Sequence, residues 1–341
     1  MKKKITHLGI DIGGAHLKVI GIDINNKIQF VDYSNCRIWE DIGLLKKKFI
    51  YLSKTLGNES IKCGITMSAE LCDNFKSRKH GALILTEKCK YLKFDNFFYV
   101  KSSKTFLKEP KFKELISMNW HSIGRFFEKK VENAIIIDFG STTTDLICIK
   151  NRKFVNKFFD DFSRINNFEL LYTGFTRTPI FGITNEINIR KNKLKIIPEF
   201  FSNTSDVYRI LKKLKRKIDI DITADGSQRT IKNSFRRLSR SFGFDYHNKY
   251  QMKLKQICNE ISSTQLNQIM SAVKKLEDRF SMKNFTVILS GIGQEVLSDF
   301  FKKKKFKTKY LHSFLSKSDL SKKASFHAPA LAIALLLKEL K

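Results

Sequence analysis

The chain has 341 residues, of which 42% are hydrophobic and 12% aromatic, including 30 phenylalanines. This composition predicts a large buried core, fits two domains better than one, and excludes a disordered chain. The 64 Lys and Arg residues outnumber the 33 Asp and Glu residues, which gives a formal net charge of +31.

The positive charge is scattered along the chain, and most of it is lysine. We interpret it as a compositional bias that suits an anionic substrate, and we do not expect nucleic acid to be a partner. The densest runs, 212–217 and 302–305, follow predicted helices, as is typical of a solvated face. An RNA-binding or filament-forming protein is the alternative, and it predicts basic residues gathered on one face and binding that weakens steeply with salt.

The cysteines and the apolar segments indicate the compartment. Six dispersed cysteines form no CxxC motif, which predicts free thiols in a reducing environment. No apolar stretch typical of a signal peptide follows the lysines at 2–4, and the late apolar run 328–337 is too short to span a bilayer. We expect a cytoplasmic protein with no membrane partner, and a homo-oligomer is compatible with the sequence.

The first half of the chain alternates strand and helix patterns. Paired strands are followed by a turn at Asn25-Asn26 and a third strand, and apolar residues then recur at helical spacing. In chain order we expect strands at 5–11, 18–24 and 28–32, a helix at 40–56, strands at 61–67, 82–85 and 97–100, and a helix at 111–130.

A strand–turn–strand pattern then recurs at 134–138 and 144–150. Two α/β lobes, residues 1–130 and 131–341, therefore share the pattern, and we expect the active site in the cleft between them. A helical insertion is predicted around 205–282, and the last helix is expected to pack back on the first lobe. The remaining predicted elements are helices at 205–214, 229–243 and 249–280, a strand at 286–289, and helices at 294–301 and 328–340.

The first hairpin predicts a phosphate site. Asp11 ends an apolar strand, Gly13 and Gly14 form a turn, and Lys18 lies on the returning strand. Glycines let backbone N–H groups approach a phosphate, and the aspartate can hold a metal ion or its water. Lys18 adds a point charge if its side chain faces the site rather than solvent. A plain β-turn is the alternative explanation of the glycines.

The second hairpin repeats this chemistry with more donors. Asp138 ends its strand, Gly140 begins the turn, and Asp145 lies on the returning strand. Hydroxyl and backbone donors can bind phosphate oxygens, and the flanking carboxylates can share a divalent ion. A threonine-rich strand, with Asp145 as a turn former, is the alternative. The donors between the two carboxylates are Ser141, Thr142, Thr143 and Thr144.

A third glycine-rich segment contains Gly291 and Gly293. It follows a predicted buried strand and opens a helix, where it could admit a flat ligand or an anion. The two hairpins and this segment, in this order, resemble the sugar kinase, actin and Hsp70 superfamily. That resemblance implies two duplicated lobes of the actin-like, ribonuclease H-like type.

Five further strings make the resemblance more specific. Together with 137–145 they are similar to the hydantoinase/oxoprolinase-related proteins of the tetrahydromethanopterin-linked one-carbon transfer pathway, whose archaeal members act in methanofuran biosynthesis. The resemblance extends from Gly9 to about Leu336. The strings are 63–73 (CGITMSAELCD), 117–120 (SMNW), 171–179 (LYTGFTRTP), 199–209 with EFF and SDVYR, and 223–226 (TADG).

The resemblance implies a transferase. An aminomethylfuran carrying a methyl diphosphate would condense with the phenol of γ-glutamyltyramine, or of a tyrosine analogue, to form an aryl ether and release diphosphate. Mg²⁺ is the expected cofactor, and the need for ATP is left open. The alternative within the same fold is an ATP-dependent small-molecule kinase or an amidohydrolase of the hydantoinase/oxoprolinase type.

The resemblance also suggests roles for individual residues. Glu70 would be the base for the phenol proton, with a helix-capping contact as the alternative. Arg177 would bind a phosphate or a carboxylate, or else form a structural salt bridge. Asp225 would bind the substrate amine or the metal, or else precede a helix as part of its cap. The diphosphate would be held by Gly13, Gly14, Lys18, Gly140, Ser141, Thr142, Thr143 and Gly291, and the metal by Asp11, Asp138 or Asp145, with Asp11 and Asp138 also counted as catalytic.

Overall fold

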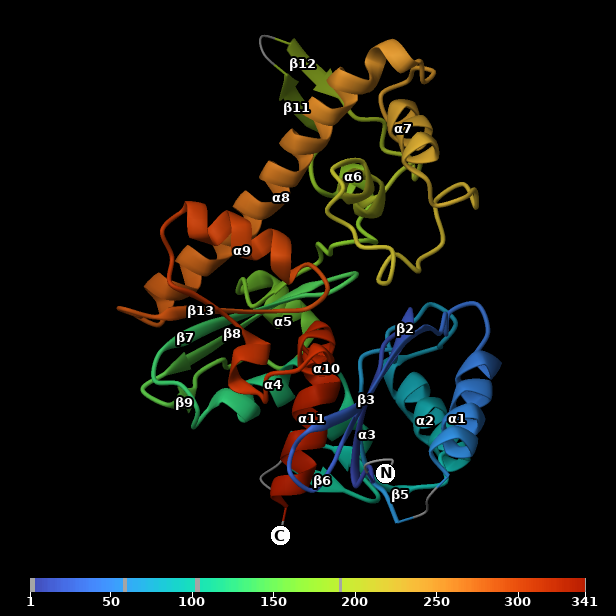
Figure 1. Cartoon of the computed structure of the whole chain (residues 1–341), viewed down its shortest axis with the longest axis vertical. Helices are drawn as coiled ribbons and strands as arrows, with labels where there is room; N and C mark the ends of the chain where they lie inside the picture. The colour runs from blue at the N-terminus through green and yellow to red at the C-terminus, as the bar shows by residue number, and fades with distance from the viewer. Residues whose placement is uncertain (1–3, 58–59, 102–104, 190–191, 341) are drawn as a thin grey trace. The chain divides into compact units, whose positions relative to one another are not determined.

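The protein is described by a computed structural model that covers residues 4–57, 60–101, 105–189 and 192–340. Contacts between residues divide the chain into two compact units (Figure 1). The first unit comprises 1–135, 147–164 and 309–341, and the second comprises 136–146 and 165–308. The lobes predicted over 1–130 and 131–341 stay a prediction.

A mixed six-stranded sheet forms the centre of the first unit, with the strand order β3-β2-β1-β4-β5-β6. β1 pairs antiparallel with β2 and parallel with β4, so the first hairpin lies at the middle of the sheet. The strands are β1 (His7–Ile12), β2 (His16–Ile22), β3 (Ile28–Asn35), β4 (Lys62–Met67), β5 (Asp95–Tyr99) and β6 (Phe106–Leu107).

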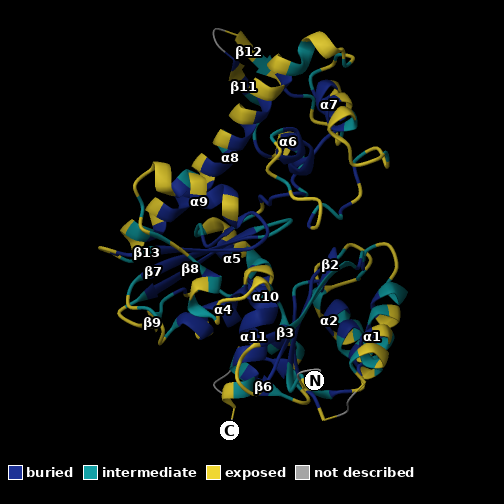
Figure 2. Cartoon of the chain, viewed as in Figure 1, coloured by how far each residue is buried: buried dark blue, intermediate teal, exposed yellow. Residues whose placement is uncertain are grey.

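One face of this sheet is covered by α1 (Gly43–Leu56) and α2 (Arg78–Lys88). Leu8, Ile10 and Ile12 of β1 pack there against buried residues of these helices, including Phe49 and Leu85. Because side chains alternate along a strand, the other residues of β1 face the opposite side. β1, β2 and β4 are almost entirely buried, whereas β3 is mostly half-buried, and Figure 2 shows exposed residues on α1.

The opposite face is covered by α11 (Ala328–Glu339), which contacts β1, β2, β4 and α4 (Asn119–Phe127). Its approach is close, because a Cβ on Gly9 would lie 1.9 Å from the Ala330 carbonyl oxygen. Gly9 and Asp11 share this face of β1, so the Asp11 side chain points to the side on which α11 packs. α10 (Asp319–Ala324) contacts β3.

A second sheet has the order β10-β8-β7-β13-β14, with β9 beside β8. α9 (Gln294–Lys303) contacts β13. The strands are β7 (Ala134–Phe139), β8 (Thr144–Lys150), β9 (Lys153–Phe154), β10 (Leu170–Leu171), β13 (Thr286–Ser290) and β14 (Thr308–Tyr310).

The helical insertion of the second unit has its own core. α6 (Thr204–Ile210), α7 (Ile231–Arg240) and α8 (Gln251–Arg279) pack around Val207, Leu238 and Ile257, with Ile187 of the β11–β12 hairpin (Glu186–Ile189 and Asn192–Lys195) beside them. Figure 1 shows α8 as a long helix that runs from the insertion toward the second sheet.

Two predicted elements are wrong. The strand expected at 82–85 lies inside α2, which begins after the N-cap Ser77, because a short apolar run fits a buried helix face as well as a strand. The single helix expected at 111–130 is split into α3 (Phe112–Leu115) and α4. The break is at Ser117, whose φ of +51° does not fit a right-handed helix.

Candidate functional site

The first hairpin is a tight turn held from both sides. The Gly13 N–H donates to the His16 carbonyl at 3.1 Å, and the Gly14 carbonyl accepts from the Ile38 N–H at 3.0 Å. A Cβ on Gly14 would lie 2.8 Å from the Cys72 sulfur, so the turn needs a glycine there. Packing within the chain therefore accounts for Gly14, and the predicted phosphate contact stays a prediction.

A row of polar side chains crosses four strands beneath this turn. Lys18 lies opposite Asp11, Tyr33 lies opposite Lys18, and Thr66 of β4 lies beside Asp11 on the other side. The Lys18 ammonium contacts Asp11 Oδ2 at 2.7 Å, so the lysine faces the aspartate rather than away from the site. We call Tyr33, Lys18, Asp11 and Thr66 the polar row.

Two buried oxygens of the polar row lack a hydrogen-bond partner in the described part of the chain. Asp11 and Thr66 are 0% and 1% exposed. Among the described residues, neither Asp11 Oδ1 nor Thr66 Oγ1 has a hydrogen-bond partner. Buried polar groups are normally satisfied, so two such atoms on adjacent strands fit a water, a hydrated cation or a phosphate oxygen.

Two histidines extend the polar row toward α11. The Tyr33 ring lies 4.7 Å from the ring of His16 and 4.7 Å from that of His327, with which it stacks. His327 is the N-cap residue of α11. Burial, and then the nearby Lys18 and His16, lower the pKa of His327 to about 3, so its imidazole is neutral at physiological pH.

Glu70 is buried in the turn after β4. Its Oε1 accepts hydrogen bonds from the Ser117 N–H at 2.8 Å and the Ser117 hydroxyl at 2.9 Å. Oε2 has no partner among the described residues. Burial raises the pKa of Glu70 above its ordinary value, although the Ser117 bonds and the charge of Arg78 act in the opposite direction. Glu70 does not cap α2, whose N-cap is Ser77.

The second hairpin closes through a Gly140 N–H bond to the Thr143 carbonyl at 2.9 Å. Asp138 Oδ1 accepts from the Ser290 hydroxyl at 3.0 Å, and Asp145 is buried on β8. The Thr144 hydroxyl donates to the Thr173 carbonyl at 2.6 Å, so this hydroxyl serves the fold.

The segment 173–178 lies directly on the second hairpin, and we call it the arginine loop. Its Phe175 N–H donates to the Gly140 carbonyl at 2.8 Å, and its Thr176 and Arg177 N–H groups both donate to the Ser141 carbonyl, at 3.2 and 3.0 Å. The contact requires a glycine, because a Cβ on Gly174 would lie 2.2 Å from the Ser141 oxygen. The fold thus brings Arg177 beside Ser141.

Two predicted site residues are occupied by contacts within the chain. Gly291 has φ of +83°, and a Cβ there would lie 2.4 Å from the Phe139 carbonyl oxygen. Asp225 contacts Arg237 at 3.0 Å. Partial burial raises its pKa, but hydrogen bonds from Ser227 and Arg237 outweigh burial and lower it to about 2. Asp225 is not the cap of α7, which begins after Thr230.

The predicted residues divide between the two units. The first contains Asp11, Gly13, Gly14, Lys18 and Glu70, and the second contains residues 138–145, Arg177, Asp225 and Gly291. Within the described ranges, no three His, Cys, Asp or Glu side chains group closely enough to form a metal site. Mg²⁺ stays a prediction.

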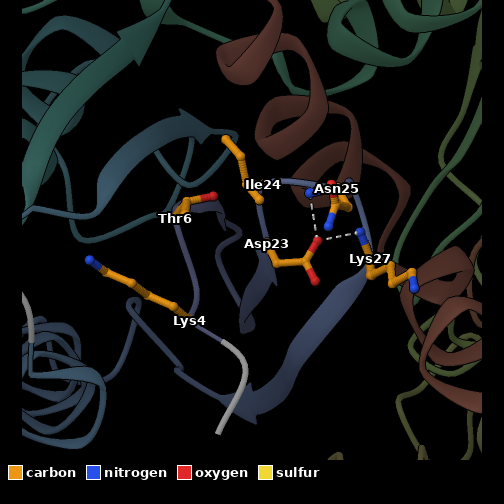
Figure 3. Close-up of a pocket in the computed structure, with 6 residues that line it drawn as sticks. All are labelled: Lys4, Thr6, Asp23, Ile24, Asn25 and Lys27. Carbon is orange, nitrogen blue, oxygen red and sulfur yellow. Dashed lines mark hydrogen bonds between the residues drawn. The ribbon is translucent and has the colours of Figure 1, made fainter. Parts of the chain in front are cut away.

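A pocket of about 300 Å³ beside the β2–β3 turn contains none of these residues (Figure 3). Asp23 Oδ1 accepts from the N–H groups of Asn25 and Lys27, at 2.8 and 2.9 Å, so its carboxylate serves the turn. None of the helices in the described part of the chain is long and apolar enough to cross a membrane.

The family model for hydantoinase/oxoprolinase matches residues 90–334. The chain belongs to the hydantoinase/oxoprolinase family. This membership confirms the family resemblance found in the sequence. The matched residues include the second hairpin, the arginine loop and the insertion.

Two relatives of this hydantoinase/oxoprolinase family member carry one name, (4-{4-[2-(gamma-L-glutamylamino)ethyl]phenoxymethyl}furan-2-yl)methanamine synthase. The protein of Methanocaldococcus jannaschii is 27% identical over 349 residues, covering 98% of both chains. That of Methanococcus vannielii is 30% identical over 208 residues, covering 61% of this chain and 91% of the relative. Both names denote enzymes.

A solved structure, the ethanolamine utilization protein EutJ from Carboxydothermus hydrogenoformans, resembles the fold. It matches 96% of this chain and 88% of its own, with a TM-score of 0.50 and 12% sequence identity. At this identity the likeness concerns the fold alone. The predicted class is confirmed: this hydantoinase/oxoprolinase family member has a mixed α/β fold of the actin-like type, with two six-stranded sheets in the described part of the chain.

The polar row was only half predicted. Asp11 and Lys18 belong to a local motif, whereas Thr66, Tyr33 and His327 reach them through strand pairing and the docking of α11. The signal for Thr66 was present in the string 63–73, where it is the polar residue between Ile65 and Met67 near the end of an apolar strand. For His327 the signal was its place before Pro329, at the start of the last helix.

Proposed function

We propose that the protein forms an aryl ether. It would join an aminomethylfuran carrying a methyl diphosphate to the phenol of γ-glutamyltyramine, or of a tyrosine analogue, in methanofuran biosynthesis that supports tetrahydromethanopterin-linked one-carbon transfer. The observation that carries the proposal is the match over 98% of both chains to a relative whose name describes a phenoxymethyl group on a furan methanamine.

The reaction defines what the residues must do. The bond between the methylene carbon and the diphosphate oxygen breaks, and its electron pair leaves with diphosphate. A bond from the phenol oxygen to the same carbon forms, and the phenol proton passes to a base. The furan ring stabilises positive charge at the carbon, so neutralising the leaving diphosphate is the main task of the protein.

The two hairpins suit that task. Each hairpin has a positive charge of its own: the Lys18 ammonium lies on the first, and Arg177 lies beside Ser141 of the second. The N–H groups of Gly13 and Gly140 close their own turns, so we expect the phosphate to be bound by other backbone N–H groups of the turns. The free Asp11 Oδ1, with Thr66 Oγ1 beside it, fits a hydrated Mg²⁺, which proteins commonly bind through one or two carboxylates, waters and substrate phosphates. When bound, Mg²⁺ would supply charge neutralisation at the diphosphate.

Glu70 is the proposed base for the phenol proton. Its raised pKa brings a carboxyl group closer to the operating pH, which favours proton transfer. Its two bonds from Ser117 orient Oε1, while Oε2 is free to accept a proton.

The test is a direct assay of the purified full chain with Mg²⁺, the aminomethylfuran diphosphate, and either γ-glutamyltyramine or tyrosine, in the absence of ATP. We expect diphosphate release together with a product of the ether's mass for one phenol. Asp11→Asn should abolish release, and the exposed Asp278→Asn on α8 should leave it unchanged. ATP hydrolysis or substrate phosphorylation without ether would instead support the kinase or amidohydrolase alternative.

A further inference from the structure

The arginine loop is bonded to the helical insertion through Thr176. Thr176 is 0% exposed, and its hydroxyl donates to Asp221 Oδ2 at 2.7 Å. Asp221 is itself 9% exposed. A buried hydroxyl bonded to a carboxylate is a stronger and more directional contact than a neutral hydrogen bond. Thr176 therefore joins two segments: its N–H contacts the second hairpin, and its side chain contacts the insertion.

Asp221 is placed by a buried cluster two residues away. Arg209 of α6 forms two hydrogen bonds to Asp219, from Nε and Nη2, each 2.7 Å long. Arg209 Nη1 also contacts Asp206 at 2.8 Å, and Arg237 of α7 contacts the same Asp206 oxygen at 2.6 Å. We call Asp206, Arg209, Asp219 and Arg237 the aspartate–arginine cluster.

Burying the charges of the aspartate–arginine cluster costs desolvation free energy, so we expect the cluster to have a role other than stabilising the fold. Asp206 and Arg237 are fully buried, and desolvating ions usually cancels much of their attraction. What such a cluster provides is geometry, because each bidentate or shared bond restricts the position of its partners. Here Arg209 attaches the segment 219–221 to α6, and Arg237 joins α6 to α7 through Asp206.

We propose that Asp221 is a positioning residue: through Thr176 it holds Arg177 beside the second hairpin, and the aspartate–arginine cluster sets Asp221 in place. The inference rests on the proposed function, in which this hairpin binds a diphosphate. It gives the insertion a role in the reaction, since a side chain held in one geometry binds its ligand without a further loss of conformational freedom.

The first test measures binding of inorganic pyrophosphate with Mg²⁺ by calorimetry, and the KM of the diphosphate substrate. Thr176→Val keeps the shape and removes the hydroxyl, so affinity should fall about tenfold and KM should rise, while Thr176→Ser should stay within about twofold of the original chain. Asp221→Asn should also weaken binding. The control is Glu186→Gln, a surface residue of the β11–β12 hairpin beside the insertion that pairs with Lys193 and Lys195.

The second test asks whether Thr176 acts through Arg177. In an Arg177→Gln background, Thr176→Val should cause no further loss of pyrophosphate affinity, whereas a merely structural role would add its full effect. Additive losses, or unchanged binding by Thr176→Val and Asp221→Asn, would overturn the inference alone. If the unsubstituted chain binds no pyrophosphate, the proposed function fails and takes the inference with it.

Discussion

Glu70 shows how one buried carboxyl can be prepared for proton transfer. Burial raises its pKa, and the Ser117 hydroxyl and N–H bonds partly oppose that rise. Between the ordinary pKa and the raised one, the folded protein holds the proton more tightly than the unfolded chain does. The free energy of unfolding contributed by Glu70 therefore falls as pH rises through that interval.

We predict that Glu70→Gln lowers kcat by about a hundredfold, the scale of a lost general base. It should also remove the pH dependence of stability that Glu70 contributes, as measured by urea unfolding at several pH values. Glu87→Gln, an exposed residue of α2, is the matched control.

Ser117→Ala removes a donor that lowers the pKa of Glu70, so the acidic limb of the rate profile should move to higher pH. A limb that stays in place would exclude Glu70 as the titrating base.

Thr66 and Thr144 allow a matched comparison between a buried hydroxyl without a partner and a buried hydroxyl that is bonded within the fold. Thr66 Oγ1 is buried with no partner among the described residues, whereas Thr144 Oγ1 donates to the Thr173 carbonyl. We predict that Thr66→Val is neutral or stabilising by up to about 1 kcal/mol, while Thr144→Val destabilises by about 1–3 kcal/mol. Urea unfolding measures both.

The same Thr66→Val protein should bind Mn²⁺ with pyrophosphate several-fold more weakly, as followed by the Mn²⁺ electron paramagnetic resonance signal. Thr66→Ser should restore binding, because it restores the hydroxyl. Equal affinity of Thr66→Val and the original chain would separate this hydroxyl from the ligand site.

At the scale of elements, the sequence predicted what depends on local chemistry. The strand at 144–150 and the start of β7 at 134 were predicted correctly, because apolar strands and glycine turns are read within one short segment. The break at Ser117 was missed, because its left-handed backbone accompanies tertiary hydrogen bonds to Glu70. The full polar row was missed for a related reason: strand register places Thr66 beside Asp11.

The packing of α11 on β1 requires a residue without a Cβ atom at Gly9. A Cβ on Gly9 would lie 1.9 Å from the Ala330 carbonyl oxygen and 2.6 Å from the Ala334 nitrogen, so the helix would have to move away from the strand. We predict that Gly9→Ala destabilises the protein by about 3 kcal/mol, the upper range for overpacking. Since His327 is the N-cap residue of α11, its stacking on Tyr33 should also be disturbed.

Gly182→Ala is the control for that experiment, because its Cβ would meet nothing closer than 3.6 Å. Chemical denaturation should place it within about 0.5 kcal/mol of the original chain. If Gly9→Ala were equally mild, the close approach of α11 to β1 would not hold in solution.

At the scale of the whole molecule, the formal charge of +31 attracts any anion in solution. A diphosphate is drawn by the summed field, and salt weakens that attraction without altering short contacts within a site. A nucleic acid would be attracted as well, so attraction alone does not distinguish an enzyme for a small anion from an RNA-binding protein. Salt dependence does, because it counts the phosphates that are contacted.

We predict that the KM of the diphosphate substrate rises severalfold as monovalent salt increases from about 0.05 to about 0.5 M, while kcat changes little. In titrations with labelled single- and double-stranded RNA at about 0.15 M salt, we expect only weak, non-saturating binding. The reason is that scattered lysines raise the local concentration of any anion, but they do not align with a regular phosphate backbone. Saturable RNA binding whose affinity falls steeply with salt would contradict this interpretation and would give the positive charge a polyanionic partner.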